Sequence, residues 1–261
     1  PQVARQYFTE AIGLARAMDD KRMLSHILSW QAQGAIVAGD PTTALAAAEE
    51  ARDLGDAIGD RSSLLEWRGN LGWALLMQGD LTASAAEFRA FIAEAEAAHD
   101  PIWKVTGLQG LGFALAYQGE ATAAQAAAEA AIEVAAEFGE YVLGLGFTAL
   151  GVAALGTGDA TAARNAEQTA RQYLGIQPAT AMTTYGRNAE AALADGDLIE
   201  ARRLADQAVN TNMGWHQMMA LTTRARVAIA QGEPERAERD AHDALTRSTE
   251  IDARAGVPDI L

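Results

Sequence analysis

A glycine followed by an acidic residue recurs along this chain of 261 residues at an almost constant interval. By subtraction, successive glycines of the six pairs are 40, 40, 39, 38 and 36 residues apart, at Gly39, Gly79, Gly119, Gly158, Gly196 and Gly232. A period of this length is typical of stacked supersecondary units, each too small to bury its apolar face alone. The recurrence therefore predicts a solenoid.

Residues 101–139 show what one unit contains. Asp100 can cap a helix N-terminus, and Pro101 follows at the first helical position, where no backbone N–H is needed. Leucines then recur at helical spacing until Gly119, which can end the helix in the left-handed conformation. A second helix, with alanines along one face, ends at Gly139. Each unit is predicted to be an antiparallel helical hairpin.

Small side chains occupy fixed rows of the repeat. Seven residues before each glycine of the pair, and again five residues after it, the chain carries alanine, glycine or serine. Helix backbones can approach closely at such positions, while larger side chains fill the holes between them. The second of these rows comprises Ala44, Ser84, Ala124, Ala163, Ala201 and Ala237.

These patterns predict an all-α fold, a right-handed superhelical solenoid of antiparallel helix hairpins. Six full hairpins are expected, at residues 21–59, 60–100, 101–139, 140–178, 179–214 and 215–252. Residues 1–18 fit the second helix of a truncated repeat, and residues 254–261 fit the start of another. The chain begins without methionine, which indicates an excised fragment. Uncapped solenoid ends are expected to fray or to self-associate.

The Gly-acid turn, the small residue before it and the alanines after it resemble the tetratricopeptide repeat, here with long units. The segments LGWALLMQGDLTASAAEFR and LGFALAYQGEATAAQAAAEAA further resemble the repeats of MalT-like, LuxR-type ATP-dependent transcriptional regulators of actinobacteria. The resemblance implies ATP-binding and DNA-binding domains outside this fragment. It also implies a cytoplasmic regulatory domain that relays the binding of an effector, a protein or a peptide to those domains. Alternatives are a small-molecule inducer sensor and the repeat domain of a signalling kinase or cyclase-like regulator.

In the repeats that the chain resembles, the first helix of each unit lines the concave face of the superhelix. This mapping gives eight candidates for binding in a concave groove. Apolar residues at helical spacing are also typical of a core, so an exposed groove and simple packing both remain open for the aromatic and methionine side chains. The candidates are Gln33, Trp73, Met77, Phe113, Tyr117, Val152, Glu190 and Arg226.

Composition argues against several other functions. The formal net charge of −15 would repel nucleic acid, whose binding depends on cations that neutralise phosphates. The chain has no cysteine and no apolar run of roughly 20 residues, so neither thiolate chemistry nor a membrane partner is expected. Its four histidines are scattered without metal-ligand spacing, and no nucleophile lies near a base in a recognisable motif. We expect no enzyme activity, metal or cofactor in this fragment.

Overall fold

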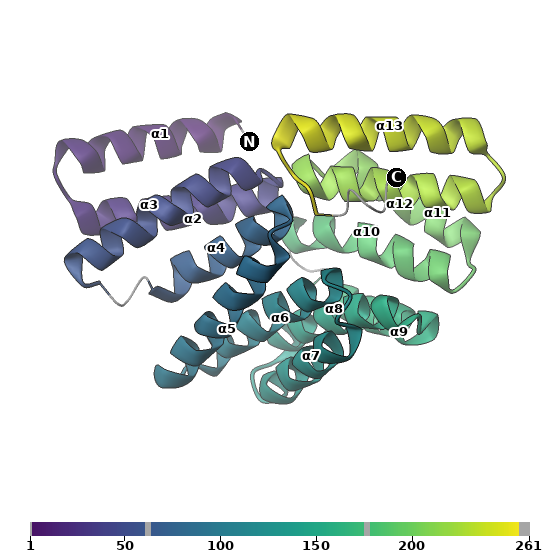
Figure 1. Cartoon of the computed structure of the whole chain (residues 1–261), viewed down its shortest axis with the longest axis horizontal. Coiled ribbons are helices and arrows are strands. Elements are labelled where there is room, and N and C mark those ends of the chain that lie inside the picture. Colours follow the sequence, from purple (N-terminus) through teal and green to yellow (C-terminus); the bar gives the residue numbers. More distant parts are fainter. Residues whose placement is uncertain (1, 61–63, 175–177, 256–261) are drawn as a thin grey trace.

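The computed structural model describes residues 2–60, 64–174 and 178–255, and these form thirteen α-helices and no β-strand. The helices pair into hairpins that stack side by side along a curved path (Figure 1). The predicted all-α solenoid is therefore confirmed. The truncated repeat expected at residues 254–261 lies mostly outside the described residues.

The first helix, α1 (Gln2–Ala17), precedes six helix pairs. The pairs are α2 (Lys21–Ala38) with α3 (Pro41–Ile58), α4 (Leu64–Gln78) with α5 (Leu81–Ala97), α6 (Pro101–Tyr117) with α7 (Ala121–Ala135), α8 (Glu140–Thr157) with α9 (Ala160–Leu174), α10 (Pro178–Ala194) with α11 (Leu198–Thr211), and α12 (Gly214–Ala230) with α13 (Pro234–Ile251).

The Gly-acid pair forms the turn inside each hairpin. Gly39 has φ +67° and caps α2 in the left-handed conformation, which glycine adopts without the strain of a Cβ atom. Asp40 then caps α3, because its carboxylate accepts the Thr43 N–H at 3.0 Å. Glu120 begins α7 without such a side-chain hydrogen bond. Glycine therefore stops one helix, and an aspartate, where present, starts the next.

Glycines and alanines let the hairpins interlock. The ring of Phe88 on α5 fills a hole over α4 and α6, where a Cβ atom at Gly72 would lie 2.9 Å from the ring and one at Gly110 only 2.2 Å. In the row that follows the Gly-acid pair, Ser84 donates a hydrogen bond to the Gly72 carbonyl at 2.8 Å. The alanines of this row are buried. Close backbone approach recurs along this core, with a larger side chain in the hole: Phe88 here, and Leu174 against Gly144 further along.

The curvature brings the last hairpin back to the first full one, an arrangement that the sequence did not predict. The Trp215 N–H at the start of α12 donates to the Gly39 carbonyl at 2.8 Å. Beyond α13, the N–H groups of Arg254 and Ala255 approach the Met77 carbonyl at 3.3 and 3.4 Å. Gly214 packs so tightly against this turn that a Cβ atom there would lie 2.2 Å from the Gly39 oxygen. We call this set of contacts the ring closure.

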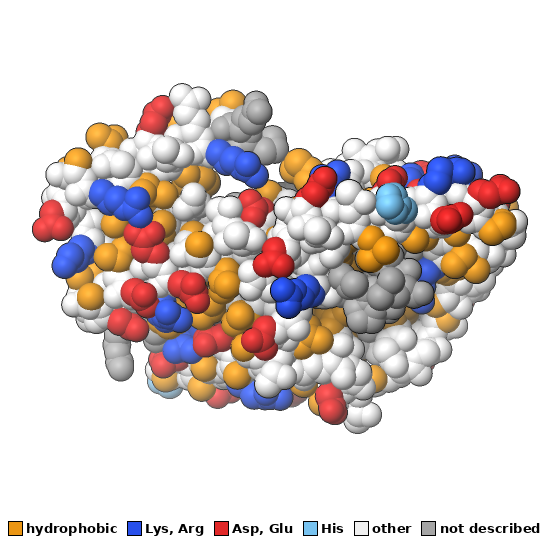
Figure 2. Space-filling model, turned by 45° about the horizontal axis from the view of Figure 1, so that its top comes forward, with side chains coloured by type: hydrophobic (Ala, Val, Ile, Leu, Met, Phe, Trp, Pro, Cys, Tyr) orange, Lys and Arg blue, Asp and Glu red, His pale blue; other side chains and the backbone are white. Residues whose placement is uncertain are grey.

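Two surface features bear on the expectations from sequence. Helix α1 exposes Val3, Tyr7 and Leu14, and Met18 is exposed in the turn that follows it. The predicted self-association through the solenoid ends stays a prediction. Within the described residues one helix, α8, is long and apolar enough to cross a bilayer by length and composition. It packs between α7 and α9 and against α6, as a core helix of the solenoid does. Basic and acidic side chains are intermixed over the face shown in Figure 2.

Candidate functional site

A pocket lies on the inside of the ring between α6, α10 and α12, with about 410 Å³ of empty space including its mouth. We call it the inner pocket. Its walls combine aromatic, charged and amide side chains. They are Phe113, Tyr117, Gly186, Arg187, Glu190, Asn212, Trp215, His216, Met219 and Thr223.

Three of the eight residues predicted from sequence, Phe113, Tyr117 and Glu190, line this pocket. Trp73 packs behind it, with its ring centroid 5.3 Å from that of Phe113. Met77 and Phe113 are only 1% and 4% exposed, so core packing describes them better than an open groove. Both belong to a cluster that includes Trp215 and Met218 of α12, the helix that covers this part of the inner face.

The other three candidates lie away from the pocket. Val152 is buried in the core, while Gln33 and Arg226 are exposed on α2 and α12. The sequence mapping predicts one continuous concave groove, whereas the ring closure places α12 over the part of the inner face that carries Met77 and Phe113.

A buried ion pair supports the pocket wall. The Arg187 Nε donates to Glu167 Oε1 at 3.0 Å, and the Asn188 amide lies 3.4 Å from the second oxygen. Burial raises the pKa of Glu167 to about 7, although the Arg187 charge opposes this shift. The guanidinium carbon also lies 5.5 Å from the centre of the Phe113 ring. Arg187 is thus held between a carboxylate and an aromatic face.

His216 is neutral in this environment because burial lowers its pKa to about 4, with a smaller effect of the Arg187 charge. Its Nε2 lies 3.1 Å from the Ile36 carbonyl oxygen, which can only accept. The ring proton therefore sits on Nε2, and Nδ1 is a hydrogen-bond acceptor. His216 belongs to both features: it lines the inner pocket, and its ring hydrogen-bonds to Ile36 of α2 at the ring closure.

Asn212 has an unsatisfied acceptor in the pocket wall. The side chain is 5% exposed, and its Oδ1 has no hydrogen-bond partner among the described residues. Its Nδ2 faces the His216 carbonyl at 3.5 Å, so rotating the amide would place two oxygens together. Nearby, the Thr223 hydroxyl lies 2.9 Å from Glu190 Oε1. The Asn212 oxygen is itself closed to solvent, so its missing partner is a cost to the fold and not an open binding group.

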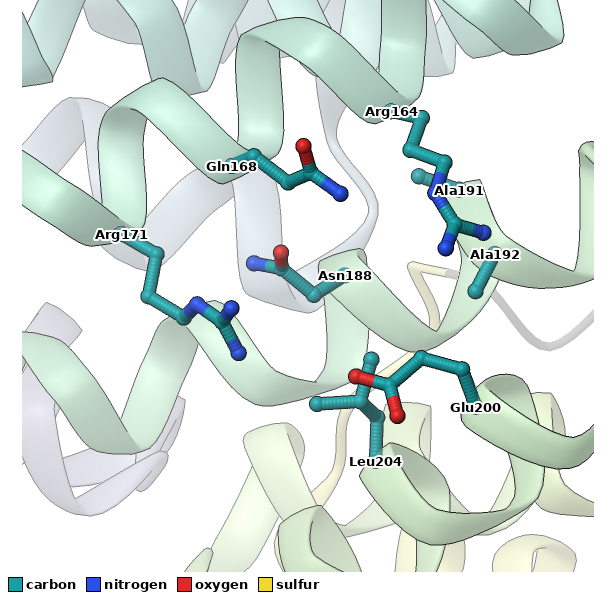
Figure 3. A pocket seen from close by; sticks show the side chains of 8 residues that line it. All are labelled: Arg164, Gln168, Arg171, Asn188, Ala191, Ala192, Glu200 and Leu204. Atoms are coloured by element: carbon teal, nitrogen blue, oxygen red, sulfur yellow. The ribbon is translucent and has the colours of Figure 1, made fainter. Parts of the chain in front are cut away.

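A second, more polar pocket of about 240 Å³ lies between α9, α10 and α11. Figure 3 shows Arg164, Gln168 and Arg171 reaching from α9 toward Asn188 on α10 and Glu200 on α11. Two of its charged groups are already paired. Arg164 contacts Asp197 at 2.9 Å, and Glu200 contacts Arg203 at 2.6 Å. We regard this outer pocket as secondary, because Arg164 and Glu200 are each held by a charged partner outside its lining.

Sequence patterns do not indicate Arg187, Asn212, Trp215 and His216 as wall residues. Asn212 ends α11 and His216 lies in the first turn of α12, outside the rows that repeat with the Gly-acid pair. Arg187, on α10, also lies outside those rows. Their convergence depends on curvature accumulated over the whole ring. Among the described residues no group of three or more His, Asp or Glu side chains could hold a metal ion.

Comparisons place the chain among known proteins. No protein-family model matches it. Proteins of Mycobacterium bovis and Mycobacterium tuberculosis, provisionally named as HTH-type transcriptional regulators, are 46% identical over 260 residues. The match covers the whole chain but only 29% of the length of these relatives.

Solved structures share the fold. A Rap conjugation gene regulator of plasmid pLS20, in complex with the Phr* peptide, has a TM-score of 0.70 at 13% identity, covering 89% of this chain and 66% of its own. A Rap protein complexed with competence and sporulation factor reaches 0.64 at 13% identity, with 98% and 82% covered. A signal transduction ATPase from Pyrococcus horikoshii, with a tetratricopeptide repeat sensor, reaches 0.57 at 15% identity, with 95% and 40% covered. The chain is a helical-repeat protein similar to part of named transcriptional regulators.

Proposed function

We propose that this chain is the regulatory helical-repeat domain of a larger transcriptional regulator, and that it receives an effector in the inner pocket. On this proposal, ATP-binding and DNA-binding domains of the LuxR or MalT-like type lie elsewhere in a cytoplasmic polypeptide. The support is the 46% identity to named regulators over the whole chain, together with helical-repeat neighbours that include gene regulators and a sensor domain.

One observation carries the proposal: α12 belongs to the inner pocket and to the ring closure at once. Trp215 and His216 line the pocket, and their backbone and ring N–H groups bond to Gly39 and Ile36 in the first full hairpin. An occupant that moves the start of α12 must therefore alter the contact between the two ends of the ring. Such a shift can be relayed if the effector binds the closed and open rings with different affinity.

The position of α12 over the inner face favours a small-molecule inducer over a bound peptide, the alternative that the Rap neighbours suggest. A peptide lying along the concave face would need the surface over Met77 and Phe113, which α12 already covers. A peptide or protein partner would then bind only after the ring opens. On this proposal the signal of effector binding passes to other domains of the same polypeptide. The contacts of those domains with the ring lie outside this chain.

A pair of glycine variants in the full-length regulator tests the proposal. Gly39→Ala places a Cβ atom 2.5 Å from the Trp215 nitrogen and should open the ring. Gly158→Ala sits at the equivalent turn, also at positive φ, with no atom within 4 Å of its Cβ. We expect G39A to change DNA affinity at least about fivefold, the lower range of allosteric coupling, and G158A to leave it unchanged. Equal DNA affinity for G39A and the unmodified regulator would refute the relay.

A further inference from the structure

We infer that residues 253–255 form a releasable latch, which holds the ring closed while it is seated against α4 and α12 and lets the ring open when it leaves. The inference rests on the proposed function, since it names the element that regulates the inner pocket. It follows from three observations on this segment: the site that receives it, the weakness of its contacts, and its hydrogen bond to Trp215.

Beyond α13 the chain turns back toward the middle of the ring, where the end of α4 receives it (Figure 1). Met77 lies in the last turn of α4, where a carbonyl has no partner within the helix. Its oxygen accepts instead from the N–H groups of Arg254 and Ala255, at 3.3 and 3.4 Å. A Cβ atom at Gly79, which has φ +88°, would lie 3.0 Å from the Arg254 Cβ and 3.2 Å from the Ala255 nitrogen. The turn after α4 is therefore shaped to receive this segment, and we call it the seat.

The latch is held weakly compared with the rest of the ring closure. Both of its hydrogen bonds to α4 are long and share one acceptor, whereas the Trp215 N–H meets the Gly39 carbonyl at 2.8 Å. Its buried side chains are two alanine methyl groups, at Ala253 and Ala255, which contribute little hydrophobic stabilisation. The Arg254 side chain between them is 78% exposed. Such a segment can leave its seat while the helices stay folded.

Helix α13 keeps one end of the latch in place. The Ser248 hydroxyl donates to the Ala253 carbonyl at 2.6 Å, and the Ala253 N–H donates to the Ser248 carbonyl at 3.1 Å. Release therefore moves Arg254 and Ala255 most. Ala255 is the better position to probe, because its side chain is buried in the seated latch.

Trp215 joins the latch to the inner pocket. Its indole N–H donates to the Ala255 carbonyl at 3.2 Å, and its backbone N–H donates to the Gly39 carbonyl. The same ring lines the inner pocket, with its centroid 6.4 Å from that of Tyr117. A shift of Trp215 caused by a ligand in the pocket therefore acts on the latch and on the Gly39 contact together.

Alkylation of an introduced thiol measures the release. The chain has no cysteine, so Ala255→Cys carries one buried thiol and Arg254→Cys one exposed thiol. With rates normalised to those of the urea-unfolded chains, we expect A255C to react about 30-fold more slowly than R254C. This factor corresponds to about two net hydrogen bonds of about fivefold each. Hydrogen exchange of the Ala255 amide in the unmodified chain should give a similar ratio without any new side chain.

Urea distinguishes a latch from a part of the core. Because release is local, the alkylation rate of A255C should stay constant at urea concentrations below the unfolding transition. A rate that rises with urea in proportion to global unfolding would overturn the inference, since the segment would then leave only when the fold is lost. A rate equal to that of R254C would also overturn it, since the segment would then have no seat.

A matched pair of glycine variants tests the seat. In the A255C background, Gly79→Ala places a Cβ atom against the latch and should speed alkylation about fivefold, the value of one net hydrogen bond. Gly119→Ala sits at the next such turn, at φ +83° with nothing within 4 Å of its Cβ, and should leave the rate unchanged. Equal rates in the two variants would show that the segment does not rest on α4.

A second pair tests whether the latch holds the ring. Gly39→Ala disturbs the other hydrogen bond of Trp215, so it should speed alkylation of A255C at least about fivefold, whereas Gly158→Ala should not. Equal rates in G39A and G158A would show that the latch and the ring closure are independent, which contradicts the inference.

The two levels of the proposal fail separately. If A255C follows global unfolding but G39A still alters DNA affinity in the full-length regulator, the latch is wrong and the relay stands. If A255C reacts as expected in all backgrounds and G39A has no effect on DNA affinity, the latch stands and the relay is wrong.

Discussion

The contact between Gly39 and the start of α12 should stabilise the folded ring by a measurable amount. The substitution Gly39→Ala would lower the stability of the fold in two ways. The first is left-handed strain of about 1–2 kcal/mol for a residue with a Cβ atom, at the observed φ of +67°. The second is loss of the closure, since its Cβ would lie 2.5 Å from the Trp215 nitrogen and 2.7 Å from the Met213 oxygen. Backbone atoms on both sides leave no flexible group to move aside.

Gly158→Ala isolates the first effect. Gly158 caps α8 with φ +78°, and nothing lies within 4 Å of its ideal Cβ. Opening the ring in G39A removes the Trp215 N–H bond to Gly39 and the His216 bond to Ile36. Each is worth about 1 kcal/mol net, and more if the freed groups stay buried. We therefore expect G39A to lower the free energy of unfolding by about 2–4 kcal/mol more than G158A does.

Urea unfolding followed by circular dichroism measures this difference, and spin labels test its cause. The chain has no cysteine, so Thr42→Cys and Glu250→Cys give two defined label positions. Both residues are exposed, and the Thr42 hydroxyl lies 3.4 Å from the Ile251 carbonyl across the closure. The distance distribution between the labels should lengthen in G39A and stay unchanged in G158A. Equal loss of stability in both variants, with equal label distances, would show that the closure contributes nothing.

Four further outcomes are expected. Burial raises the pKa of Glu167 to about 7, so the folded state binds this proton at a higher pH than the unfolded state does. In a His216→Gln background the free energy of unfolding should therefore rise by up to about 3 kcal/mol as the pH falls from 7 to 4.5. Urea titrations at several pH values measure this change. Burial lowers the pKa of His216 to about 4, so between pH 6.5 and 4 the unfolded state binds a proton that the folded state does not. In Glu167→Gln the free energy of unfolding should therefore fall as the pH decreases from 6.5 to 4. A free energy of unfolding independent of pH in both variants would contradict these assignments. Gly110→Ala should cost about 1–3 kcal/mol by overpacking against the Phe88 ring, whereas Gly13→Ala, with nothing within 4 Å, should be neutral or slightly stabilising in thermal melts. Asp80→Ala should cost about 1 kcal/mol because its carboxylate accepts the Ala83 N–H at 3.1 Å, and Glu120→Ala, which removes no cap bond, should cost less.

Local chemistry explains why the helix pairs could be predicted from sequence. A glycine that must adopt positive φ and an acid that can cap the next helix leave a signature that repeats wherever the turn does, as at Gly39 and Asp40. The alanine row beside Phe88 leaves a second signature, because close helix approach requires small side chains at one level of every unit. Each of these signals arises from residues within one repeat or two neighbouring repeats.

The inner pocket left no such signature. Its walls come from α6, α10 and α12, and the contact of Trp215 with Gly39 joins residues far apart in the chain. Whether a solenoid closes depends on a small rotation per repeat, added over six repeats, which no single motif encodes. The sequence therefore identified Phe113 and Tyr117 as inner-face residues but could not show that α12 covers Phe113 or that Asn212 lacks a partner.

The closure also limits how strong the proposed relay can be. If breaking the Trp215 and His216 bonds to the first full hairpin costs about 2–4 kcal/mol, the closed ring outweighs the open one by about 30- to 1,000-fold. An effector changes this ratio only by its difference in affinity for the two forms. Inverting a ratio of 99 to 1 needs about 5.5 kcal/mol, which is more than one or two neutral hydrogen bonds in the inner pocket would supply. A small ligand in the inner pocket should therefore reinforce the closed ring, and opening it would require a larger partner that competes for the surface beneath α12.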